Sequence, residues 1–221
     1  MNCMVLLSGC GHMDGSEIRE SVLVLLELDR LNVKFLCCAP NSPQQDVVNH
    51  ISKSQVGSET RNILEESARI ARGDVIDIRE VQTSEFDMLV IPGGFGVAKN
   101  FSNLVSQNGP VEVLGGVKSL IQGFYLAKKA IGAVCIAPAI VASALSELVR
   151  VQVTLGDDTD GIISRCGGEH VACPTDDYVT DEKNRIFSCS AYMRDDRLYK
   201  VHIGIQKMVE GMTKLVRESR S

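Results

Sequence analysis

The strongest constraint on the fold is an alternation of short apolar runs with longer segments of helical period. Short runs rich in Leu and β-branched residues occupy 3–8, 33–39, 87–91 and 131–135. Segments of helical period follow or separate them, at 16–30, 60–72 and 111–129, and Pro138 suits the first turn of a further helix. This pattern is typical of a parallel sheet with crossover helices, so we predict an α/β fold with helices on both faces of the sheet.

Within this frame, the first helix is expected to bury Ile18, Val22, Leu25 and Leu26, which share one helical face. The segment 40–55 is polar and rich in turn residues. Short strand candidates at 151–155, 170–173 and 186–190 are expected at an edge of the same sheet. A last helix is predicted over 198–216, and no linker divides the chain, so residues 1–221 are expected to form one domain.

Composition excludes several classes of function. The net charge is −5 and no basic cluster stands out, which argues against nucleic acid as a partner. No apolar stretch reaches the roughly 18 residues of a membrane-spanning helix. The first residues lack the features of a secretion signal, so a cytoplasmic location is expected, in which the eight cysteines remain free thiols.

Because ligands of open α/β sheets bind at the carboxyl ends of the strands, the residues after each strand carry the functional signal. Cys135 stands where the run 131–135 gives way to a helix, as the nucleophile does in a nucleophile elbow. The helix N-terminus is expected to lower the pKa of this thiol below about 8.5 and make it reactive. The alternative is a small buried hydrophobic side chain.

Two further strand ends supply candidate partners. Gly93 and Gly94 follow Pro92, and glycines let backbone N–H groups approach an oxyanion, so Gly94 and Ile136 are the expected oxyanion-hole donors. Glu17 either completes a capping box with Asp14 or lies beside Cys135 as general acid and base. The remaining candidates for the wall of the substrate pocket are Gly93, Cys10, Gly11 and Asn100.

Two rival site types receive little support. Gly9, Gly11 and Gly15 resemble a dinucleotide fingerprint, but the acidic residue expected after the second strand is replaced by the sequence CAP at 38–40. The pairs His12 with Asp14 and His170 with Cys173 lack further ligands at a known spacing, so no metal site is expected.

Several motifs together resemble the ElbB family of the PfpI-like superfamily, which is related to class I glutamine amidotransferases. They are SGCGHMDGSE at 8–17, ETRN at 59–62, PGGFGVAKN at 92–100, CIAPA at 135–139 and HVACP at 170–174, followed by the acidic pair at 176–177. The resemblance spans nearly the whole chain. It implies a flavodoxin-like three-layer sandwich and a homodimer.

The resemblance also implies a cofactor-independent glyoxalase that converts glyoxal, a small dicarbonyl, to glycolate, an activity that can reflect protein deglycation. Cys135 would be the nucleophile, Glu17 the partner carboxyl, and Gly94 with Ile136 the oxyanion hole. Two departures stand out: Ile136 replaces the histidine that follows the cysteine in proteases of the superfamily, and TLGDD at 154–158 lacks the histidine of related glyoxalases. The third catalytic position is therefore unassigned. The alternatives are a redox sensor that uses Cys135, or a regulatory protein linked to isoprenoid biosynthesis without turnover of its own.

Overall fold

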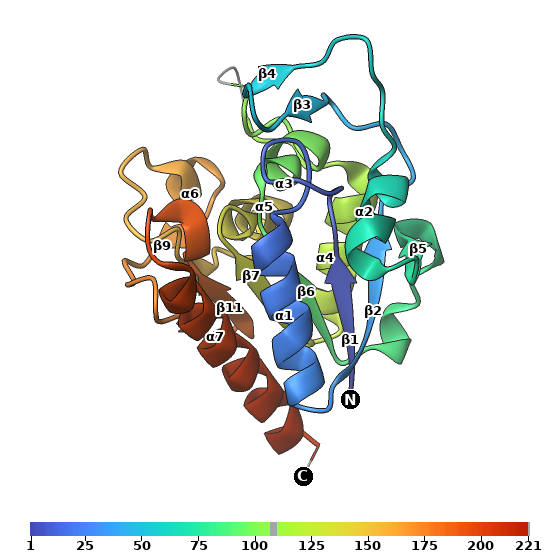
Figure 1. Cartoon of the computed structure of the whole chain (residues 1–221). Coiled ribbons are helices and arrows are strands. Elements are labelled where there is room, and N and C mark those ends of the chain that lie inside the picture. The colour runs from blue at the N-terminus through green and yellow to red at the C-terminus, as the bar shows by residue number, and fades with distance from the viewer. Residues whose placement is uncertain (107–109, 221) are drawn as a thin grey trace.

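A seven-stranded sheet forms the centre of the computed structural model, which describes residues 1–106 and 110–220 (Figure 1). The strand order is β10-β11-β7-β6-β1-β2-β5. All neighbouring strands are parallel except the edge pair of β10 and β11. The strands are β1 (Asn2–Leu6), β2 (Lys34–Ala39), β5 (Val75–Asp77), β6 (Met88–Ile91), β7 (Ala130–Val134), β10 (Val179–Asp181) and β11 (Ile186–Cys189).

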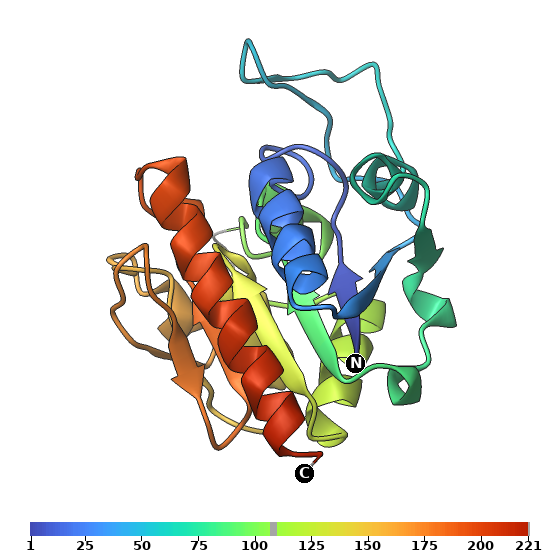
Figure 2. The same ribbon diagram turned by 60° about the horizontal axis from the view of Figure 1, so that its bottom comes forward.

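Helices cover both faces of this sheet. Figure 2 shows α1 (Ile18–Arg30) and α7 (Leu198–Glu218) side by side across one face. The opposite face packs against α4 (Gly115–Leu126) and α5 (Ala137–Leu145). The remaining helices are α2 (Ile63–Ala71), α3 (Phe95–Asn100) and α6 (Ile162–Arg165). The predicted three-layer, flavodoxin-like fold is thereby confirmed.

Strand β1 illustrates how the sequence builds the two layers. Side chains of a strand alternate between the two faces of its sheet. Met4 and Leu6 accordingly pack toward the α4 and α5 side, whereas Cys3 and Val5 pack toward α1 and α7. All four are fully buried, which explains why this run is continuously apolar rather than alternating.

The region after α5 differs from our expectation. Of the three strand candidates there, only β11 joins the main sheet. β8 (Gln152–Val153) and β9 (Glu169–His170) instead pair with each other in a separate two-stranded sheet. The turn-rich segment 40–55 likewise contains a small hairpin, β3 (Val48–Asn49) with β4 (Ser54–Gln55). The two-residue strands of this hairpin carry too little periodicity to be recognised from sequence.

The predicted apolar face of α1 is wrong. Ile18, Val22 and Leu26 are 46%, 50% and 51% exposed, and the helix buries a different face. That face contains two carboxyl residues, Glu20 and Glu27, together with Ser21, Val24 and Leu28. The Glu27 side chain accepts a hydrogen bond from Arg30 and pairs with His202 of α7, at 2.7 Å in each case. Polar partners supplied by distant segments thus allow α1 to turn its acidic face inward.

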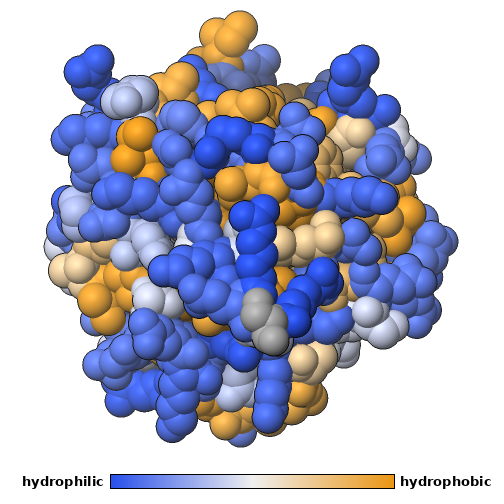
Figure 3. Space-filling view, turned by 90° about the horizontal axis from the view of Figure 1, so that it is seen from below, coloured by the Kyte–Doolittle hydropathy of each residue, from blue (hydrophilic) through white to orange (hydrophobic). Residues whose placement is uncertain are grey.

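The amino ends of the strands lie at one end of the molecule. The surface there is mostly hydrophilic, and its apolar side chains occur in small groups (Figure 3). No helix in the described ranges is both long and apolar enough to cross a membrane.

Candidate active site

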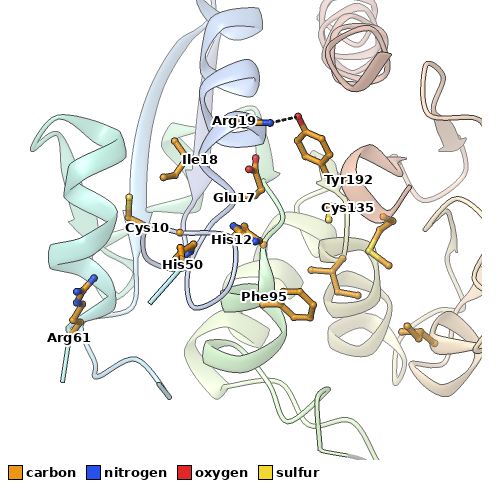
Figure 4. A pocket seen from close by; sticks show the side chains of 15 residues that line it. Cys10, His12, Glu17, Ile18, Arg19, His50, Arg61, Phe95, Cys135 and Tyr192 are labelled. Atoms are coloured by element: carbon orange, nitrogen blue, oxygen red, sulfur yellow. Dashed lines mark hydrogen bonds between the residues drawn. The ribbon is translucent and has the colours of Figure 1, made fainter. Parts of the chain in front are cut away.

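A cavity of about 980 Å³ opens at the carboxyl ends of the parallel strands. Cys10 and Gly11 reach it from the loop after β1, and Gly94 and Cys135 from the ends of β6 and β7. Figure 4 shows how its side chains are distributed: Cys10, His50 and Arg61 lie toward one side, and Cys135 and Tyr192 toward the other. The full lining is Cys10, Gly11, His12, Glu17, Ile18, Arg19, His50, Arg61, Gly94, Phe95, Cys135, Ile136, Ile162, Tyr192 and Met193.

Cys135 occupies a strained turn between β7 and α5. Its φ is 61°, in the left-handed region that residues other than glycine seldom adopt. Its backbone N–H donates to the carbonyl of Cys189 at 2.9 Å, which extends the parallel pairing of β7 with β11 by one residue. Pro138 lies in the first turn of α5 immediately afterwards. Such a conformation persists only where the surrounding structure holds it, and it is typical of functional sites.

Two backbone donors converge on the Cys135 sulfur. The N–H groups of Gly94 and Ile136 hydrogen-bond to it and act to lower its pKa. Gly94 has a φ of 106°, and a Cβ at this position would lie 2.4 Å from the backbone nitrogen of Glu17. These are the two donors expected from the sequence, and their role as an oxyanion hole stays a prediction.

Glu20 is the carboxyl that hydrogen-bonds to the thiol of Cys135. Its side chain is fully buried, with Oε2 accepting from the Gly93 N–H at 3.0 Å and Oε1 from the Tyr192 N–H at 3.2 Å. Burial and then the charge of Glu17 raise the pKa of Glu20 to about 8. Glu20 therefore holds a proton at neutral pH and can exchange it with Cys135.

Glu17 has a different position from the one we expected. It is the N-cap of α1, and its Oε2 accepts a hydrogen bond from the backbone N–H of Glu20 at 2.6 Å. It also lines the cavity. Asp14 does not cap this helix; its Oδ2 instead accepts from the backbone N–H of Val48 at 2.8 Å. Neither interpretation of Glu17 is right as stated: Glu17 caps the helix itself instead of completing a capping box with Asp14, and Glu20 occupies the place beside the sulfur.

The expected lowering of the Cys135 pKa is also wrong. Burial, followed by the negative charge of Glu20, raises the pKa of this thiol well above its ordinary value. The hydrogen bonds from Gly94 and Ile136 oppose this shift without overcoming it. The resting side chain is therefore a thiol, and a nucleophilic thiolate requires transfer of its proton to Glu20.

Gly93 and Asn100, which we expected in the wall of the substrate pocket, do not line the cavity but support the residues that do. A Cβ on Gly93 would lie 2.4 Å from the Cβ of Cys135 and 2.6 Å from Glu20 Oε2, so a glycine is needed for the two side chains to meet. The Asn100 amide donates to the carbonyls of Ser8 and Asp14, each at 2.9 Å. Asn100 thus fixes the loop that carries Cys10 and Gly11.

The sequence interpretation missed several residues of the site, namely the buried Glu20 behind Cys135 and some residues of the cavity wall. Glu20 shares a helical face with Val24 and Leu28, and a glutamate at such a position is a signal that could have identified it. Arg19, His50, Arg61 and Tyr192 come from segments that only the tertiary fold brings together.

Comparison with known proteins identifies relatives over most of the chain, although no family model matches it. Human glutamine amidotransferase-like class 1 domain-containing protein 3, mitochondrial, is 34% identical over 96% of this chain and 82% of its own length. The mitochondrial ES1 protein homolog of Rattus norvegicus is 33% identical over the same shares.

Solved structures show the same relationship. An isoprenoid biosynthesis protein with an amidotransferase-like domain from Ehrlichia chaffeensis is 58% identical, covers 97% of this chain and 98% of its own, and superposes with a TM-score of 0.93. A mutant of Schizosaccharomyces pombe DJ-1 shares the fold at a TM-score of 0.58, with 16% identity over 100% of this chain and 99% of its own.

Proposed function

The chain belongs to the family of glutamine amidotransferase-like proteins that includes ES1, and from this premise we propose that it is a cofactor-independent glyoxalase, which converts glyoxal to glycolate. The observation that carries the proposal is the contact between the Cys135 thiol and the buried, protonatable Glu20 carboxyl at one end of an open cavity. A nucleophile in hydrogen-bond contact with a base is the arrangement that covalent catalysis requires.

The reaction begins with addition of sulfur to an aldehyde. Glu20, in its ionised form, takes the thiol proton as Cys135 attacks one carbonyl carbon of glyoxal. The C–S bond forms, the C=O π pair moves onto oxygen, and the N–H groups of Gly94 and Ile136 stabilise the resulting oxyanion. Glu20 returns the proton to this oxygen, which gives a hemithioacetal and restores the carboxylate.

The remaining steps move hydrogen between the two carbons. Glu20 removes the proton on the carbon bonded to sulfur, giving an enediol, and a proton is returned to the neighbouring carbon. The product is a thioester of glycolate on Cys135, which water hydrolyses to glycolate and free thiol. The sum is glyoxal plus water to glycolic acid, so no oxidant, reductant or cofactor is consumed.

The alternative of a redox sensor has weaker support. Peroxide reacts with thiolates at accessible sites, whereas Cys135 is 8% exposed and burial raises its pKa.

The test is a direct assay with carbon-13 glyoxal followed by NMR. We expect labelled glycolate to form with the wild-type protein, and mass spectrometry of acid-quenched protein to find a two-carbon acyl adduct on the peptide that contains Cys135. Absence of glycolate, or formation at an equal rate with Cys135→Ala of unchanged circular dichroism, would contradict the proposal.

A further inference from the structure

The cavity is much larger than glyoxal requires. Glyoxal has four non-hydrogen atoms and occupies the space of a few water molecules, each of about 30 Å³. The cavity measures about 980 Å³, and Cys135 lies toward one side of it (Figure 4). The opposite side, around Arg61 and His50, is therefore available for a part of the substrate that does not react.

Arg61 is a cation on that opposite side. Arg61 faces the cavity and shares the buried carboxylate of Glu66 with Arg69, at 3.8 Å and 2.9 Å respectively. Glu66 therefore pairs with both guanidinium groups. The other acidic partner of Arg61 is Glu59, at 3.0 Å, which is half exposed and so screened by water. Glu17 is the acidic residue among those that line the cavity.

Two imidazoles also line the cavity. The rings of His12 and His50 contact each other edge to face, with centroids 5.0 Å apart. His50 Nδ1 lies 3.0 Å from the Val48 carbonyl, which assigns the hydrogen to Nδ1, and Nε2 accepts from the Met13 N–H at 3.3 Å.

The carboxyl of Asp14 lies beside His50. Its Oδ1 is buried, makes no hydrogen bond within the described ranges, and lies 3.8 Å from His50 Nε2.

We propose that this side of the cavity, formed by Arg61, His50 and His12, binds a phosphate monoester at the far end of the substrate whose carbonyl reacts with Cys135. The substrate class is then a phosphorylated 2-oxoaldehyde of about sugar size. The reactive end of this substrate is inferred from the proposed glyoxalase function. Its anionic end is inferred from the Arg61 side of the cavity alone. Guanidinium groups are donors that proteins use for phosphate oxygens.

The kinetic test compares 3-deoxyglucosone with its 6-phosphate, each converted to the corresponding 2-hydroxy acid with the addition of water. We expect kcat/KM to be about 10- to 100-fold higher for the phosphate, as charged hydrogen bonds imply. Arg61→Gln should reduce this ratio to near one. Arg69→Gln is the matched control, because it removes the same charge from the other partner of Glu66 but lies outside the cavity lining. Equal kcat/KM for the two substrates in the wild type, or an unchanged ratio in Arg61→Gln, would overturn the inference.

A binding measurement separates this inference from the proposed function. Cys135→Ala protein is titrated calorimetrically with glucose 6-phosphate and with glucose, neither of which needs to react. We expect the phosphate to bind and Arg61→Gln in the same background to weaken it at least about tenfold, with an unchanged melting temperature. If this binding is found but no dicarbonyl is converted, the glyoxalase proposal fails and the anion site stands. If glyoxal is converted but phosphate binding does not depend on Arg61, the anion site fails alone.

Discussion

Two cysteines line the same cavity, and their surroundings differ in one decisive respect. Burial raises the pKa of both Cys10, which follows β1, and Cys135, which follows β7. For Cys10 the further causes are the charges of nearby side chains, Glu66 first. For Cys135 the charge of Glu20 and a hydrogen bond to its carboxyl raise the pKa further, and hydrogen bonds from two backbone N–H groups lower it. A thiol that is only buried stays protonated and unreactive. A thiol buried beside a protonatable carboxyl can transfer its proton to that carboxyl.

The largest expected difference is between the two alanine substitutions. Cys135→Ala should lower glycolate formation at least about 10³-fold, because it removes the atom that forms the covalent bond. Cys10→Ala should change the rate less than about threefold, because its sulfur has no part in the proposed chemistry. Initial rates at saturating glyoxal would measure both, and a larger loss from Cys10→Ala would reverse the assignment of the nucleophile.

The next largest effect concerns the two carboxyls near Cys135. Glu20→Gln should reduce kcat/KM about 10²- to 10³-fold, because the amide cannot accept the thiol proton. Glu17→Gln should cost less than about tenfold, since its structural contact is the helix cap, and an amide oxygen still accepts from the Glu20 N–H. Stopped assays on both variants, with circular dichroism as the folding control, would decide. A greater loss from Glu17→Gln would restore Glu17 as the general base.

The pH profile gives a smaller but diagnostic effect. Because burial raises the pKa of Glu20 to about 8, the carboxyl that must accept the thiol proton is mostly protonated below this pH. Activity should rise about tenfold per pH unit below the inflection and level off above about pH 8. The apparent pKa belongs to the Cys135 and Glu20 pair as a unit. Glu20→Gln should remove the inflection, and a wild-type profile that falls across the neutral range as pH rises would contradict this mechanism.

The smallest expected effect is on the thermal stability of the protein when the packing beside Cys135 is changed. Gly93→Ala places a Cβ 2.4 Å from that of Cys135, and overpacking of this kind costs about 1–3 kcal/mol, or several degrees in Tm at this size. Gly115→Ala is the control, because a Cβ added at this position, at the start of α4, meets nothing within 4 Å. Differential scanning calorimetry would compare them, and equal Tm values would show that the Gly93 contact relaxes without cost.

Much of this organisation follows from the sequence. The short apolar runs and the longer helical segments predict the sheet and its layers, and the strand ends predict Cys135, Gly94 and Ile136 as neighbours. The orientation of α1 does not follow. Its Ile, Val and Leu stripe predicts one buried face, and the actual face depends on partners that lie far along the chain. His202, for example, contacts Glu27 from a position 175 residues away.

The same limit explains the error at Glu17. Glu17 is the N-cap of α1, and Glu20 lies in its first turn, three residues later. The rules of helix capping favour Glu17 for contacts with local backbone groups. Which of them meets Cys135 depends on how α1 rotates against the sheet, and that rotation is a property of the packed core. Arg61 and His50 reach the cavity through loops, whose path periodicity does not describe.

The left-handed backbone at Cys135 has a consequence for engineering. A glycine would adopt a φ of 61° without the penalty that a side chain incurs, so this position retains a residue that is unfavourable for the stability of the fold. Stability screens that select on melting temperature alone would therefore favour replacement of Cys135 by glycine and discard the thiol. Replacing Cys135 by glycine would then raise the thermal resistance and remove the proposed chemistry at the same time. This is a stability–activity trade-off at a single residue.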